Sequence, residues 1–246
     1  MKNLLISTLF LLSACTPIAT QKSPRSTQSN QIGSHNYEEM NKKHQELLSQ
    51  GKKFLANGER KKSIFNCFNP IIKDYENIYR NTSKRLYSAR TKAEHDFYLM
   101  ATHLNQLEKI HVLSEMWSLA YYLKAYALLE LQEIDLAQKT MAKALKLSPS
   151  NAKYLSEMGH IYHLKKEVKK SLQNYLLAEK AVALLSPNTL KKSELLRAKR
   201  GIGFSFIELK DLKSAERVYR EILAINSKDK IARKELKYIQ AIKKSR

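Results

Sequence analysis

Residues 118–149 read SLAYYLKAYALLELQEIDLAQKTMAKALKLSP, and the predicted architecture rests on this segment. Apolar residues recur in it at helical spacing, a turn is expected around residues 133–137, and Pro149 marks the end of the second helix. Small residues, Ala125, Ala137 and Ala144, stand where two helices must approach closely, because a larger side chain would push the helices apart. The stretch therefore predicts a hairpin of two helices.

Two further copies of this pattern follow along the chain. The second copy is displaced by 34 residues and the third by 44 more, so ten extra residues fall around residues 184–193. The matching residues are Gly159, Ser171 and Ala178 in the second copy and Gly203 and Ala215 in the third, where Tyr219 also fits but the larger Ile222 replaces the last small residue. Repeats of this length are typical of stacked helical arrays, in which each unit packs on its neighbours.

The repeat resembles the tetratricopeptide repeat (TPR), a helix–turn–helix unit of 34 residues with small residues at these positions. The resemblance implies an all-α fold, a right-handed α-solenoid with three units in residues 115–229. Residues 36–114 match it poorly and are expected to form a degenerate helical, TPR-like region, with two helices in residues 78–114. Residues 230–246 are predicted to form a basic helix that caps the stack.

The amino terminus predicts an exported, lipid-anchored protein. Lys2 precedes nine apolar-rich residues, 4–12, which are too few to cross a bilayer that takes about 20 residues. Residues 12–15, LSAC, resemble the lipobox of bacterial lipoproteins, which implies that residues 1–14 are a signal peptide and that Cys15 is acylated. The alternative is an ordinary secretory signal with an incidental cysteine. Residues 15–35 are predicted to be the lipidated cysteine and a flexible tether.

The resemblance also bears on location, because Thr16 stands where an Asp would signal retention in the inner membrane. We therefore expect an outer membrane protein whose domain faces the periplasm. The remaining thiol, Cys67, lies in an apolar stretch and is expected to pack in the core.

Composition narrows the function classes. The 246 residues include 6 Gly and 5 Pro, too few for the turns and Gly-rich loops of sandwiches, barrels and nucleotide-binding α/β folds. With 44 Lys+Arg against 23 Asp+Glu, the net charge is +21. Nucleic acid would suit such a charge in the cytoplasm, but export argues against it. Contact with anionic lipid or peptidoglycan is the expected use of the basic surface, unless the lysines simply solvate the backs of helices.

The sequence predicts no catalysis, metal or cofactor. It lacks a phosphate loop, a dinucleotide fingerprint, a metalloprotease helix and a nucleophile elbow. The glycines at residues 201 and 203 fall inside a predicted helix rather than after a strand. His160 and His163 are three residues apart, but no third ligand clusters near them in the sequence.

A binding groove is expected where the first helices of the units meet. Residues spaced i, i+4 and i+7 project from one face of a helix, and the TPR resemblance assigns that face to the concave groove. The predicted groove residues are Tyr122, Tyr126, Leu129, Ser156, His160, His163, Arg197, Arg200, Phe204 and Ile207. They would suit an extended or helical peptide with apolar anchors and an acidic group. The alternative for Tyr122, Tyr126 and Phe204 is packing against a neighbouring helix.

These features together predict a non-catalytic outer membrane lipoprotein that acts as a scaffold for a protein client. Its length, lipobox and repeats resemble those of the type IV pilus assembly lipoproteins (pilotins). One alternative is an adaptor that recruits peptidoglycan hydrolases, as another group of TPR lipoproteins does. A second alternative is direct binding of anionic envelope polymers through the basic surface.

Overall fold

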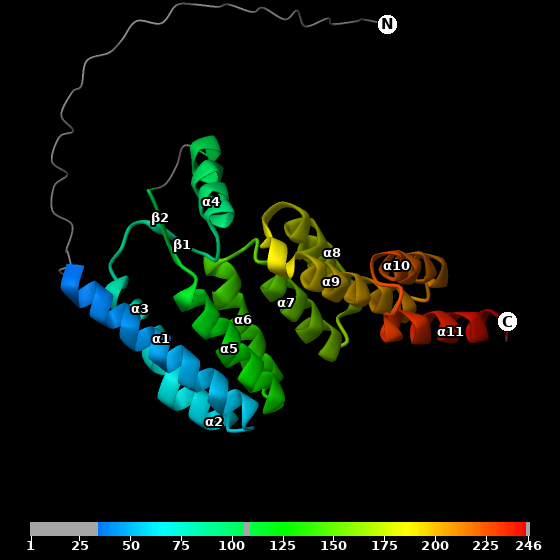
Figure 1. Ribbon diagram of the computed structural model, residues 1–246, viewed down its shortest axis with the longest axis horizontal. Coiled ribbons are helices and arrows are strands. Elements are labelled where there is room, and N and C mark those ends of the chain that lie inside the picture. The colour runs from blue at the N-terminus through cyan, green and yellow to red at the C-terminus, as the bar shows by residue number, and fades with distance from the viewer. Residues whose placement is uncertain (1–33, 106–108, 245–246) are drawn as a thin grey trace, which may run out of the picture.

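The computed structural model describes residues 34–105 and 109–244, a row of helices with a small two-stranded sheet near one end (Figure 1). The predicted signal peptide, Cys15 and nearly all of the tether lie outside the described residues. The elements are α1 (Ser34–Ala56), α2 (Arg60–Lys62), the π-helix η1 (Ser63–Phe68), α3 (Asn69–Ile78), β1 (Arg85–Ala89), α4 (Lys92–Asn105), β2 (Ile110–Ser114), α5 (Met116–Glu130), α6 (Ile134–Leu147), α7 (Ala152–Leu164), α8 (Val168–Leu185), α9 (Asn188–Glu208), α10 (Leu212–Ile225) and α11 (Lys230–Lys244).

Helices α5 to α10 form three successive pairs, and α11 packs on α10 at the end of the row (Figure 1). The turn inside each pair has the same geometry, with Gln132, Lys166 and Lys210 at φ values of 64°, 62° and 62°. These residues are spaced by 34 and 44 positions, like the repeats in the sequence. In each turn the backbone N–H of the residue that follows donates a 2.9 Å hydrogen bond to the carbonyl five residues earlier. This bond satisfies a carbonyl group at the end of the first helix.

The same turn occurs in the amino-terminal hairpin of α1 with α2, η1 and α3. Gly58 has a φ of 80°, and the Glu59 N–H donates to the Phe54 carbonyl over 2.8 Å. The second helix of this hairpin contains a π-helical segment just before Pro70, where the Asn69 N–H donates to the Ile64 carbonyl. Such a widened turn accommodates the missing N–H of a proline inside a helix.

The prediction of two helices in residues 78–114 was wrong. The structure has β1, α4 and β2 there, and the two strands pair in parallel, with Arg85 opposite Ile110 and Ala89 opposite Ser114. Each strand has five residues, which is too short for two-residue alternation to be told from helical spacing. The two strands pair only because α4, which lies between them in the chain, brings them side by side. The fold remains predominantly helical.

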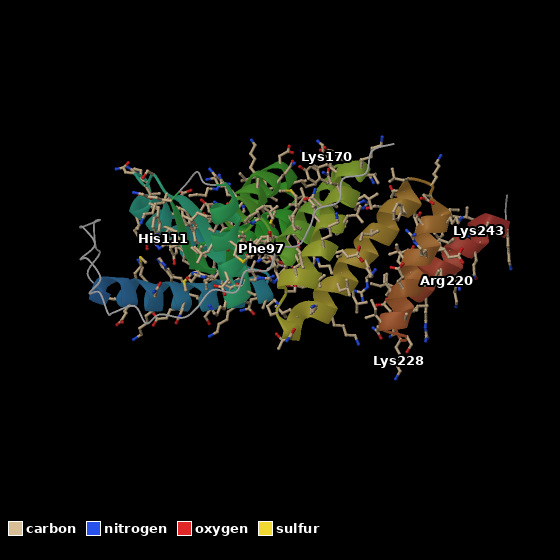
Figure 2. All side chains as sticks on the ribbon, turned by 90° about the horizontal axis from the view of Figure 1, so that it is seen from above. Phe97, His111, Lys170, Arg220, Lys228 and Lys243 are labelled. Atoms are coloured by element: carbon tan, nitrogen blue, oxygen red, sulfur yellow. The ribbon has the colours of Figure 1, made fainter. Side chains whose placement is uncertain are left out.

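The core runs through the row in connected clusters. The largest contains Cys67, Phe68, Trp117 and Met141 and joins the amino-terminal hairpin to α5, α6 and α7, while a second cluster fills the contacts among α8, α9, α10 and α11. Between residues 34–105 and 109–244, no helix is both long and apolar enough to cross a membrane. Figure 2 shows Lys170, Lys228 and Lys243 extending outward from the helices.

Candidate peptide-binding groove

An open hollow of about 450 Å³ lies between the first helices of the three pairs and α11, and we call it the groove. The predicted residues that line it are Tyr126, His160, His163, Arg197, Arg200 and Phe204. They come from α5, α7 and α9, and helical spacing puts them on one side of each helix. Six of the ten groove residues expected from the sequence are therefore brought together in one hollow.

Aromatic and imidazole rings form the apolar part of the groove. His163 meets the face of Phe204 edge-on, with ring centroids 4.7 Å apart, and His160 stacks 6.4 Å from His163. Burial lowers the pKa of the His163 imidazole, so this ring is uncharged at neutral pH. The described residues hold no group of three His, Cys, Asp or Glu side chains placed to bind a metal ion. The histidine pair contributes ring surface to the groove beside Phe204.

Both groove arginines are already paired with buried carboxylates. Arg197 Nη2 donates to Glu157 Oε2 over 2.5 Å, and Arg200 Nη2 donates to Asp229, whose other oxygen caps the start of α11. The carboxylate partners are 3% and 2% exposed, whereas the Arg197 side chain is 44% exposed. The arginines are thus less available to an acidic client group than the sequence suggested. Arg197 still presents free donors at the surface, because a guanidinium has five N–H groups.

Tyr126 connects the groove to the amino-terminal hairpin. Its side chain is partly exposed, and its hydroxyl donates to Glu130 Oε1 over 2.9 Å. Glu130 in turn accepts a 2.5 Å hydrogen bond from Arg60 Nε on α2. The hydrogen bond to Glu130 raises the pKa of Tyr126, and the bond from Arg60 lowers that of Glu130. The ring is therefore held in place while one face remains open to the groove.

Four of the predicted groove residues do not line the hollow. Tyr122 stacks on Tyr154 with ring centroids 4.9 Å apart, and the Lys153 ammonium lies 4.6 Å from the Tyr122 centroid, so Tyr122 follows the packing alternative. Leu129 and Ser156 are buried, and Ile207 packs into the core of α9 to α11. The amino-terminal hairpin and the sheet also cover α5, and the apolar residues on all sides of α5 agree with that cover.

Sequence reasoning also missed groove residues from other elements. Glu157 stands next to a predicted position, and Ile231 and Glu235 are spaced i, i+4 on α11. Tyr175 and Tyr219 reach the groove from the second helices of their pairs. The i, i+4 spacing on α11 was a usable signal, but the sequence presented that helix as a cap rather than as a wall.

Comparison with known proteins identifies the repeat and the fold. A family model described as tetratricopeptide repeat matches residues 119–151. Residues 119–151 are a tetratricopeptide repeat. The row of helices has the all-α fold of TPR solenoids, as predicted from the repeats. No curated protein matches the sequence.

Several solved structures share this architecture at low sequence identity. PilF of Pseudomonas aeruginosa has a TM-score of 0.56 at 16% identity, over 84% of this chain and 71% of that one. TPR-like repeats of a putative kinesin light chain of Podosopora anserina have a TM-score of 0.54 at 12% identity, over 85% and 88% of the two chains. The MamA RS-1 protein gives 0.53 at 13% identity, over 82% and 85%. These likenesses concern the fold.

Proposed function

We propose that this chain is a lipid-anchored, non-catalytic scaffold that holds a protein client in the groove. The observation that carries the proposal is a hollow lined by half-exposed rings on the first helices of three stacked pairs. Apolar area on rigid elements binds a partner at low cost in conformational entropy. The groove is open along the row of helices, which suits a segment of chain better than a small molecule.

The client that fits is an extended or helical segment with aromatic or long aliphatic anchors. Phe204 and Tyr126 would receive such anchors, and Ile231, which is 50% exposed, widens the apolar floor toward α11. The ion pairs of Arg197 and Arg200 leave the groove near neutral, so apolar contact supplies most of the binding free energy. An acidic group on the client would add a contact with the exposed part of Arg197.

The cellular setting we propose is assembly of an envelope machine, of the type IV pilus or secretion type, at the outer membrane. The lipobox at residues 12–15 supports acylation of Cys15, and PilF, a pilus assembly lipoprotein, supports the machine because its architecture is similar. The domain would then face the periplasm at the end of its tether. Direct binding of envelope polymers through the basic surface of α10 and α11 is less favoured, because Arg220 and Lys243 already bind Glu216.

Affinity capture with the domain from residue 34 onward, from solubilised envelopes, tests the client. We expect a secretin or another pilus component with the wild-type domain, and none with the double variant Tyr126→Ala, Phe204→Ala. The matched control is Leu176→Ala, Leu184→Ala on the outer helix α8, where both side chains are exposed. Circular dichroism checks that the wild-type domain, the groove variant and the control variant are all folded. Recovery of a peptidoglycan hydrolase would favour the adaptor alternative, and capture that the groove variant leaves unchanged would move the site.

Mass spectrometry of the protein from membranes tests the anchor. The proposal predicts that the mature chain begins at Cys15 with fatty acyl groups attached, and that Cys15→Ser leaves the signal segment in place. An unmodified amino terminus at Met1 would contradict it.

A further inference from the structure

A second hollow of about 420 Å³ opens on a different side of α5 from the groove, and we call it the basic pocket. It lies where the end of α3, the start of β1, the first turns of α5 and the last turns of α6 meet. The strand β1 packs against both α5 and α6 at this point. The pocket has the size of a small-molecule site, and nothing in the proposed scaffold function uses it.

The floor of the basic pocket is apolar and aromatic. Trp117 is 7% exposed and stacks on Tyr75 and Tyr79, with ring centroids 5.3 and 5.9 Å away. Its indole N–H is buried, and among the described residues it meets only the Tyr121 hydroxyl, outside normal hydrogen-bond geometry. Tyr121 and Leu147 complete this floor. A buried donor without a well-placed acceptor has lost its hydration, so a ligand with an acceptor atom would restore a hydrogen bond.

The rim of the basic pocket carries four cations and one carboxylate. The cations are Lys84, Arg85, Lys143 and Lys146. The carboxylate is Glu76, which accepts hydrogen bonds from the Tyr121 hydroxyl and, at 3.2 Å, from Lys143 Nζ.

Glu76 neutralises only one of these cations. Burial works against its charged form, but the hydrogen bonds from Tyr121 and Lys143 outweigh burial and lower the pKa of the carboxyl. Glu76 therefore stays ionised, and it forms an ion pair with Lys143. Within residues 34–105 and 109–244, Lys84 and Lys146 have no ion-pair partner. The rim thus keeps an excess of positive charge above an apolar floor.

The excess positive charge also affects the pKa of a neighbouring lysine. Lys124 donates a 2.7 Å hydrogen bond to Asn69 Oδ1 close to the pocket, and its pKa is lowered by burial and then by the repulsion of Lys143. Cations that repel one another around a partly desolvated hollow bind an anion more strongly than separate surface lysines do.

We propose that the basic pocket binds an anionic group, a carboxylate, sulfonate or phosphate, carried on a flat apolar body. The body would stack on the floor at Trp117 and Tyr121, and the anion would meet Lys84, Arg85 and Lys146 at the rim. The chain's own amino-terminal segment is not the ligand, because residues 1–33 contain no Asp or Glu. The anion that we propose belongs to another molecule, either a free small molecule or the end of a partner chain.

The single tryptophan of this protein makes the test direct. Trp117 contributes one indole N–H signal to a nitrogen–proton NMR spectrum, so binding at the floor moves an assigned peak. The probes are 2-naphthoate, the uncharged 2-naphthol and inorganic phosphate. We expect 2-naphthoate to shift the indole signal saturably and to bind about tenfold or more tightly than either other probe, since one charge-assisted contact and the stacked ring are each lost. A short peptide ending in Trp, with a free or an amidated carboxyl terminus, then distinguishes a partner chain from a small molecule.

Variants locate the site. Lys84→Ala and Lys146→Ala should each weaken 2-naphthoate about tenfold, whereas Lys180→Ala, an exposed lysine of α8, should leave its affinity unchanged. Trp117→Phe keeps a ring and removes the indole donor; its affinity, measured by calorimetry, should fall while the domain stays folded by circular dichroism. Equal affinity for 2-naphthol and 2-naphthoate, no shift of the indole signal, or equal effects of Lys146→Ala and Lys180→Ala would overturn the proposal.

Discussion

Arg90 and Glu194 stand 104 positions apart in the chain, yet Arg90 Nη1 donates a 2.7 Å hydrogen bond to Glu194 Oε1. The same guanidinium holds Glu94 through its Nε, and none of these three side chains is more than 8% exposed. Arg90 follows β1, Glu94 lies in the first turn of α4 and Glu194 lies in α9. The small sheet is therefore locked to the third helix pair by a buried charge cluster.

Replacing Arg90 should destabilise the protein severely. Arg90→Ala would leave two buried carboxylates without their cation, and breaking a buried pair in this way costs about 3–5 kcal/mol. Urea unfolding followed by circular dichroism measures the change. The matched control is Lys92→Ala, which removes a partner of Asp96 at a pair whose side chains are 88% and 46% exposed, and should cost far less than Arg90→Ala. Equal losses in the two variants would contradict the buried cluster.

Tyr175 provides a second test, because its ring fits between two glycines of neighbouring helices. A Cβ on Gly201 of α9 would come within 2.3 Å of the ring, and one on Gly159 of α7 within 3.0 Å. Gly201→Ala should therefore destabilise by about 1–3 kcal/mol through overpacking, despite the gain of about 1 kcal/mol in helix propensity. Gly159→Ala needs a smaller adjustment of Tyr175 and should cost clearly less. Thermal unfolding of both variants makes the comparison, and a Gly201→Ala protein as stable as wild type would show that the ring moves freely.

These glycines also show how far the sequence reaches. Gly159 and Gly203 belong to the repeat pattern and were expected at close helix contacts, and Gly203 does lie against Tyr219. Gly201 lies outside that pattern, yet its contact with Tyr175 is the tighter one, because the ring comes from a helix one pair earlier. The repeat pattern located ten extra residues between the second and third copies but did not assign them to helix. In the structure they lengthen α8 and α9 to 18 and 21 residues.

The groove was predictable in part for the same reason. Within one helix, spacing decides which residues share a face, so His160, His163, Arg200 and Phe204 were expected together and do lie together. Spacing does not tell what packs on that face. Glu157 and Asp229 form ion pairs with the two groove arginines. Such pairs join segments distant in the chain, so spacing within one helix does not predict them. The two strands escaped prediction because each is short and the partner of each lies beyond a helix.

His163 should make stability depend on pH over the interval just below its ordinary pKa of about 6.5. Burial lowers its pKa below the ordinary value of 6.5, so over that interval the unfolded chain binds more protons than the folded one. The free energy of unfolding should then fall as pH drops below about 6.5 and change little above pH 7. His111, whose pKa is lowered by burial and by Lys84, acts in the same direction. Carboxylates with lowered pKa values, such as Asp229, lose their contribution at lower pH.

Urea unfolding at several pH values separates the histidines. His163→Gln should flatten part of the slope, His163→Gln combined with His111→Gln should flatten more, and the 44%-exposed His95→Gln serves as the control. An unchanged slope in the double variant would mean that neither ring titrates with folding.

Tyr126 allows the ring and the hydroxyl to be tested apart. Tyr126→Phe removes the hydrogen bond to Glu130 but keeps the half-exposed ring over the groove, so client capture should persist and stability should fall by about 1 kcal/mol or less. Tyr126→Ala removes both, and capture should fall about tenfold or more, since one buried aromatic anchor commonly contributes about 2 kcal/mol to an interface. Glu130→Gln weakens the link to Arg60 without touching the ring, and should behave like Tyr126→Phe. If Tyr126→Phe abolished capture, the Tyr126–Glu130–Arg60 chain of hydrogen bonds, and not the apolar surface of the ring, would recognise the client.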